Sequence, residues 1–189
     1  LSFSNNHTHL QEFGGKYYLF YQNVSLLDNM HLNGASGYRS MNVDALEVDT
    51  KKSEFKMGTM TSKGVEQLKK LDPFKTNEGE TANVTAGIEY KKVSKSMAAI
   101  GSDGSWTVVC GADFGKDGAK LFAARVMGEG IIEIRLDDKD SAAVGAIQFS
   151  SAEDYSTVYC ELSEAITGEH DVYLVFGGNE ITLDQWQFK

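Results

Sequence analysis

The chain has 189 residues, of which 41% are hydrophobic, and it carries a net charge of −9. This composition suits one globular domain or two small ones and excludes a disordered chain. The acidic balance argues against nucleic acid as a partner, because phosphate contacts need Lys and Arg. No apolar run approaches the roughly 18 residues of a membrane span, so we expect no membrane partner either. Residues 1–73 contain eight basic and eight acidic side chains, so the negative charge belongs to the remainder of the chain.

The first 56 residues contain three or four strand-like runs. Residues 8–13 and 16–22 are separated by Gly14-Gly15 and predict a hairpin. Further strands are expected at 38–44 and 45–49, after a long loop. This set of strands is typical of one β-propeller blade, which would expose both faces and both edges if it stood alone. We therefore expect this block to be an incomplete β-propeller whose other blades lie upstream.

Residues 57–73 are expected to connect two domains. Within them, residues 65–71 place apolar side chains at i, i+3 and i+6, which fits a short helical turn and an extended strip equally poorly. Asp72-Pro73 favours a turn or an extended conformation and therefore a boundary.

Residues 74–189 contain short strand-like runs separated by glycines. Ile132, Ile134 and Leu136 alternate with charged residues, which is the period-two pattern of a half-buried strand. Eight such strands in about 115 residues predict an all-β domain, an antiparallel β-sandwich or jelly roll. The expected strands are 87–93, 106–109, 120–126, 130–136, 145–149, 157–162, 170–176 and 181–188.

The two cysteines, Cys110 and Cys160, are too few for a disulfide scaffold and have no CxxC spacing. Both lie in or beside expected strands. They are either a bonded pair or, as we expect, two buried thiols.

Five short motifs follow one another through residues 74–189. They are Thr76-Asn77-Glu78-Gly79-Glu80 with its E-x-E pattern, then Asp113-Phe114-Gly115, 122–126 (FAARV), 132–137 (IEIRLD) and 183–188 (LDQWQF). In this order they resemble family 6 carbohydrate-binding modules. The resemblance implies a β-sandwich, a carbohydrate ligand and a structural calcium ion.

Motifs in the first block resemble a second family. Asn5-Asn6-His7, 15–21 (GKYYLFY) and Tyr38-Arg39-Ser40 resemble the last part of a glycoside hydrolase family 43 five-bladed propeller. Such enzymes remove arabinose or xylose units from plant polysaccharides. The resemblance implies a bacterial protein that is extracellular or periplasmic after removal of an upstream signal. It assigns no catalytic residue to this segment, because the family's catalytic carboxylates lie on earlier blades.

Glu78, Glu80 and Asp184 are the first metal candidates. Glu78 and Glu80 share one strand face because the side-chain period is two, and calcium prefers carboxylate and carbonyl oxygens. The resemblance implies a calcium ion at these positions. The alternative is a group of acidic residues that repel one another at a sheet end.

Two residues of the first block are also candidates. The resemblance implies that His7 points into the propeller axis and contacts a metal ion or its water shell, and imidazole is a common ligand. The alternative for His7 is a hydrogen bond within a turn. Arg39 lies where the family places an arginine near the sugar pocket, and its alternative is an ordinary surface cation.

The family's sugar cleft is only partly present. Its glutamate, first aromatic ring, second aromatic ring and asparagine fall at Lys91, Ala99, Tyr155 and Thr182. Tyr155 alone keeps its chemistry, so we expect the usual cleft to bind sugar weakly or not at all. Tyr155 could form a substitute platform with Tyr90 and Tyr159, unless these rings simply pack in the sheet.

Three functional hypotheses follow. The chain is the C-terminal portion of an arabinan- or xylan-degrading hydrolase, with the module bracing or targeting the propeller. Alternatively it is a genuine sugar-targeting module with altered residues, or a non-catalytic adhesin. We favour the first.

Overall fold

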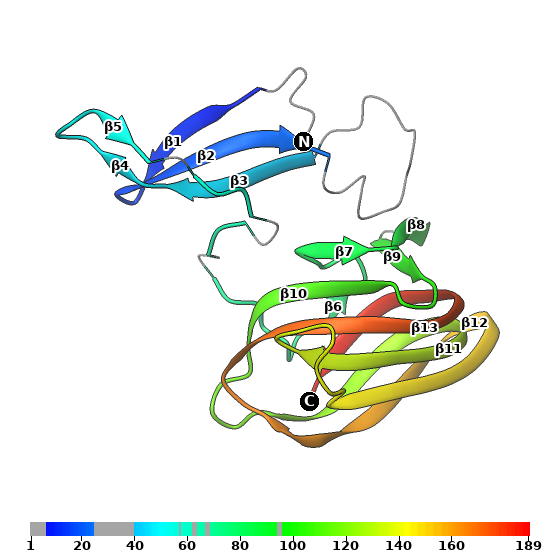
Figure 1. Cartoon of the computed structure of the whole chain (residues 1–189). Coiled ribbons are helices and arrows are strands. Elements are labelled where there is room, and N and C mark those ends of the chain that lie inside the picture. Colours follow the sequence, from blue (N-terminus) through cyan, green and yellow to red (C-terminus); the bar gives the residue numbers. More distant parts are fainter. Residues whose placement is uncertain (1–6, 25–39, 57, 62–63, 67–68, 94–95) are drawn as a thin grey trace. The chain divides into compact units, whose positions relative to one another are not determined.

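The computed structural model divides into two compact units, Leu1–Gln67 and Leu68–Lys189 (Figure 1). The structure describes residues 7–24, 40–56, 58–61, 64–66, 69–93 and 96–189. All regular elements in these residues are β-strands, so the all-β prediction is confirmed for this part of the chain. No helix of these residues is long and apolar enough to cross a membrane.

The first unit contains a three-stranded antiparallel sheet in the order β1-β2-β3. Its strands are β1 (His9–Phe13), β2 (Lys16–Asn23) and β3 (Ser40–Leu46), followed by the small pair β4 (Val48–Asp49) and β5 (Glu54–Phe55). Gly14 and Gly15 both have positive φ, 58° and 77°, which a two-residue hairpin turn requires. The predicted hairpin is confirmed.

The sheet of this unit has little interior. Among its described residues only Tyr21 and Asp44 are buried, whereas Phe13, Met41 and Phe55 are exposed. The Tyr21 hydroxyl donates to Asp44 Oδ2 at 2.5 Å, and the Thr61 N–H donates to the same oxygen at 3.1 Å. Burial and the neighbouring carboxylate raise the pKa of Tyr21. A polar contact therefore occupies the centre of the sheet, and apolar side chains lie on its surface.

The second unit is one large antiparallel sheet that curls over itself, as Figure 1 shows. Its order is β12-β11-β13-β10-β7, with β6 and β9 also pairing with β13 and β8 pairing with β9. The strands are β6 (Asn77–Glu78), β7 (Val84–Ala86), β8 (Glu89–Val93), β9 (Ser96–Gly101), β10 (Trp106–Asp113), β11 (Ala119–Leu136), β12 (Gly145–Ile166) and β13 (Glu169–Phe188). This arrangement fits the predicted β-sandwich.

Three pairs of expected strands are continuous in the structure. Residues 120–126 and 130–136 both belong to β11. In the same way, β12 contains the expected strands 145–149 and 157–162, and β13 contains 170–176 and 181–188. The ladders shift register near Gly128, whose φ is 112°, and Gly178 on β13 has a φ of 137°. Glycine allows β11 and β13 to bend there without ending the hydrogen bonding.

The curl encloses the core of the unit. Its centre is aromatic: the Phe188 ring lies 4.9 Å from both the Phe114 and the Phe122 ring, and Trp186 stacks on Phe122 at 6.5 Å. Isoleucine, leucine and valine side chains of β11 and β13 complete it. Cys110 and Cys160 are half-buried free thiols, and burial raises the pKa of Cys160.

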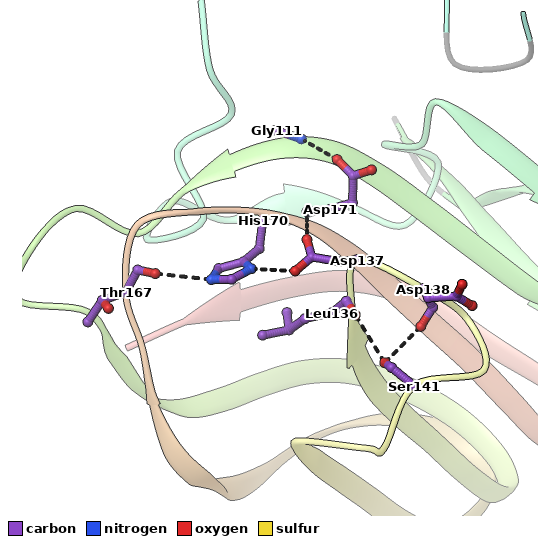
Figure 2. A network of polar contacts seen from close by, with 8 residues as sticks. All are labelled: Gly111, Leu136, Asp137, Asp138, Ser141, Thr167, His170 and Asp171. Carbon is purple, nitrogen blue, oxygen red and sulfur yellow. Dashed lines mark hydrogen bonds and ion pairs between the residues drawn. The ribbon is translucent and has the colours of Figure 1, made fainter.

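A polar network closes one end of this sheet (Figure 2). Asp137 Oδ2 lies 2.8 Å from His170 Nδ1, and Asp137 Oδ1 accepts from the Asp171 N–H at 3.0 Å. The Asp171 carboxylate in turn accepts from the Gly111 N–H at 3.0 Å, and His170 Nε2 lies 3.1 Å from the Thr167 carbonyl. The network therefore connects the end of β11 with β13 and β10.

The end of the expected connector belongs to the second unit, where it is hydrogen-bonded to β10 and β13. Leu71 accepts from the Asp113 N–H at 3.0 Å and donates to the Gly111 carbonyl at 3.3 Å, and the Phe188 N–H donates to the Pro73 carbonyl at 2.9 Å. The described residues of 65–71 form no helical turn. The domain bounds 1–56, 57–73 and 74–189 stay a prediction.

Candidate functional site

Glu78 lies on β6 where this strand pairs with the last part of β13, which contains Asp184. Glu80 lies in the turn after β6, so the expected strand face shared by Glu78 and Glu80 is wrong. Glu78 is opposite Gln185, and the Gly79 N–H donates to the Asp184 carbonyl at 2.6 Å. Gly79 allows this approach, because a Cβ there would lie 2.0 Å from the Leu183 carbonyl oxygen. The E-x-E segment and Asp184, remote in the sequence, are thus side by side.

The three carboxylates have different partners. Gln185 Nε2 donates to both oxygens of Glu78, at 3.4 and 3.2 Å, and the Met97 N–H donates to Glu80 Oε1 at 3.2 Å. Asp184 Oδ2 forms an ion pair with Arg125 Nη1.

Two buried carboxylate oxygens of this region, Glu80 Oε2 and Asp184 Oδ1, have no hydrogen-bond donor among the described residues. An unpaired buried carboxylate oxygen is costly, and each of these two oxygens is a hard ligand of the kind that calcium prefers. Within the described ranges, no three His, Cys, Asp or Glu side chains form a metal-binding group. A cation here would therefore need backbone carbonyls or water as ligands in addition to carboxylate oxygens.

Tyr155 lies on β12 and is covered on one face by an arginine. The Arg125 Cζ atom is 4.4 Å from the centroid of the Tyr155 ring, within the range of a cation–π contact. Burial raises the pKa of Tyr155, the Asp184 charge raises it further, and Arg125 opposes both. The sequence did not predict this contact, because Arg125 and Tyr155 lie on different strands.

The other positions of the expected sugar cleft lie on β8, β9 and β13. Tyr90 on β8 is opposite Ala99 on β9, and Ala99 is in turn opposite Leu183 on β13. Burial raises the pKa of the Tyr90 hydroxyl. Thr182 is opposite both Ile100 and Met127 and is only 5% exposed. Ala99 is fully buried and Lys91 is exposed. Thr182 therefore offers a ligand little surface, and the sugar-binding roles of Tyr90, Tyr155 and Thr182 stay predictions.

A shallow hollow of about 100 Å³ lies beside Arg125 on β11, β12 and β13. It is lined by Thr76, Ala123, Ala124, Arg125, Thr157, Gln185, Trp186 and Gln187. Sequence analysis did not single it out, because the residues come from four separate segments.

In the first unit, His7 is exposed and lines a separate hollow of about 340 Å³. The other lining residues are Thr8, His9, Phe20, Tyr21, Gln22 and Met41. Arg39 lies outside the described residues. The roles expected for His7 and Arg39 stay predictions.

The model of one protein family, the carbohydrate binding module (family 6), matches residues 78–189. The chain belongs to this family. The matched region of this carbohydrate-binding module begins in β6 and contains the whole large sheet from there onward.

Relatives and solved structures extend the likeness to both units. An arabinoxylan arabinofuranohydrolase from Paenibacillus polymyxa is 33% identical over 202 residues, which cover 97% of this chain and 31% of the relative. A relative of the same name from Bacillus subtilis (strain 168) is 30% identical, with 93% and 37% covered. The chain thus spans about a third of the length of these curated relatives and is homologous to them over nearly all of its own length.

Two solved structures are similar as well. A glycoside hydrolase family 43 arabinoxylan arabinofuranohydrolase from Bacillus subtilis, in complex with cellotetraose, matches with a TM-score of 0.77 and 29% identity, covering 98% of this chain and 41% of that one. A family 6 module from Clostridium cellulolyticum in complex with xylose matches with a TM-score of 0.58 and 30% identity, covering 63% and 99%.

Proposed function

We propose that this chain is the C-terminal portion of an arabinoxylan-degrading glycoside hydrolase, in which the carbohydrate-binding module braces or targets the catalytic domain. The observation that carries the proposal is the match of 98% of the chain to a family 43 hydrolase with a TM-score of 0.77. The chain covers 41% of that protein, and the proposal places the catalytic carboxylates outside the present segment. The localisation that fits is extracellular or periplasmic, in a bacterium.

The first unit supports the proposal by its incomplete packing. Phe13 and Met41 are 57% and 79% exposed, and such apolar surface on a small sheet suits burial by adjoining strands. We assign the sheet β1-β2-β3 to the last blade of a five-bladed propeller. The full-length gene product should release arabinose from arabinoxylan, and the present chain should release none. Release by the present chain alone would refute the assignment.

The proposed ligand of the module is a xylan-type polysaccharide. The solved relative in complex with xylose is 30% identical, and the half-buried Tyr155 ring, covered by Arg125 on one face, is an aromatic side chain of the kind that stacks on sugars. The replaced cleft positions Lys91, Ala99 and Thr182 predict weak binding. In affinity electrophoresis, arabinoxylan in the gel should retard the full chain slightly, and Tyr155→Ala should abolish the retardation. Equal migration with and without the polysaccharide would remove this function.

The proposed cofactor of the module is a structural calcium ion at Glu80 and Asp184, with Glu78 turned toward Gln185. The two buried oxygens without donors support it. A ligand that binds only the folded state increases the free energy of unfolding, by about 2.7 kcal/mol at a ligand concentration of 100 times its Kd. The melting temperature rises as a consequence. EDTA should therefore lower the melting temperature of the second unit, and calcium should restore it. An identical melting curve in EDTA would rule out the site.

A further inference from the structure

Arg125 lies between the two halves of the candidate site. Its Nη1 atom contacts Asp184 Oδ2, and its guanidinium carbon is 4.4 Å from the centre of the Tyr155 ring. One side chain thus contacts both the carboxylate proposed to hold calcium and the ring proposed to bind sugar.

Tyr155 lies at an irregularity in the ladder between β11 and β12. In the ladder between β11 and β12, Val126 is opposite Ser156 but Gly128 is opposite Ser151. One residue of β11, Met127, therefore faces residues 152–155 of β12. Within the described register Tyr155 has no opposite residue, so its ring takes its position from side-chain contacts.

Asp184 is in the opposite situation. Its side chain is 4% exposed, and the preceding residue of β13, Leu183, is fully buried. A buried carboxylate needs compensating charge. Arg125 supplies this charge at Oδ2, while Oδ1 has no donor. A cation bound at Oδ1 would fix the orientation of the carboxylate and therefore the position in which Oδ2 holds the guanidinium.

We infer that Arg125 is a positioning residue that couples the cation site at Asp184 to the sugar-binding ring of Tyr155. The inference rests on the proposed calcium and sugar sites. Binding energies are reciprocal, so calcium should tighten sugar binding by the same factor by which sugar tightens calcium binding, and about fivefold is a typical lower value.

The first experiment measures the affinity of the full chain for arabinoxylan in calcium and in EDTA. The wild-type affinity should fall about fivefold in EDTA. Arg125→Ala should bind about tenfold more weakly and equally in both buffers, while calcium still raises its melting temperature. Arg125→Lys keeps a charge for Asp184 but loses the planar group that stacks on the ring, so it should keep its melting temperature and not its sugar affinity.

Lys189→Ala is the matched control. Lys189 Nζ lies 5.4 Å from the centre of the ring of Tyr159, which lies on β12 like Tyr155. This variant therefore also removes a cation from the face of a tyrosine on β12, but not from Tyr155. Its affinity and its calcium dependence should equal those of the wild type. If the wild type binds arabinoxylan and Arg125→Ala binds it with the same affinity, the inference is overturned and the proposed function is left intact.

A second experiment needs no sugar. The rate of nitration of Tyr155 by tetranitromethane, followed by peptide mass spectrometry, reports how well the ring is held. In the wild type, EDTA should increase the rate, and in Arg125→Ala calcium should have no effect on it. Wild-type rates that are equal with calcium and with EDTA overturn the coupling, even if arabinoxylan binding itself fails.

Discussion

Asp137 offers a quantitative test of how the polar network of Figure 2 stabilises the module. Its carboxylate is the acceptor for both His170 Nδ1 and the Asp171 N–H. It also has a φ of 64°, in the left-handed region that Asn, Asp and Gly tolerate better than Ala. Asp137→Ala therefore removes two hydrogen bonds and adds backbone strain.

The expected loss in the free energy of unfolding follows from the two hydrogen bonds and the backbone strain. Each hydrogen bond contributes about 1 kcal/mol, and the contribution of the contact with His170 is at the lower end because the Asp137 side chain is 61% exposed. The left-handed conformation costs Ala about 1 kcal/mol more than Gly. We expect losses of about 3 kcal/mol for Asp137→Ala, about 2 for Asp137→Gly and about 1 for Asp137→Asn, which keeps one acceptor oxygen.

Urea unfolding followed by tryptophan fluorescence measures these losses. The chain has two tryptophans, Trp106 and Trp186, and both lie in the second unit, so the signal reports the module alone. Asp138→Ala is the control, since Asp138 Oδ1 accepts a hydrogen bond from Asp140 within the same turn, and it should cost less than about 1 kcal/mol. A loss below about 0.5 kcal/mol for Asp137→Ala would refute the reasoning.

The remaining predictions concern Gly79 and Tyr90. Gly79→Ala should lower the free energy of unfolding by about 3 kcal/mol in the same assay, because its Cβ would lie 2.0 Å from the Leu183 carbonyl oxygen. Gly104→Ala is the control: the space around Gly104 is open, so the loss should be about 1 kcal/mol, for the positive φ alone. For Tyr90, burial raises the pKa above the usual value of about 10. The contribution of Tyr90 to stability should therefore be constant below about pH 10 and fall as the pH rises beyond it, when the unfolded chain ionises first. Tyr90→Phe should flatten that fall in alkaline melting curves, and an identical alkaline profile would contradict the assignment.

The sequence alone determined the local structure of the chain. Gly14-Gly15 between two strand-like runs predicted the hairpin β1–β2, because a two-residue turn requires positive φ at both positions. The alternation of Ile132, Ile134 and Leu136 with charged residues predicted a strand, and the order of five motifs indicated the family that the matched residues 78–189 confirm. These signals are local, since turn chemistry and side-chain period act within a few residues.

Tertiary structure decided the contacts that give the candidate site its properties. The sequence predicted separate short strands, but hydrogen bonding continues across the bends of β11, β12 and β13. Asp184 was predicted as a metal ligand, yet only the fold shows that one of its oxygens is held by Arg125, 59 residues away, and that the other has no donor. The stacking of Arg125 on Tyr155 likewise depends on which strands lie side by side. Long-range pairing and burial set these partners, and no local pattern encodes them.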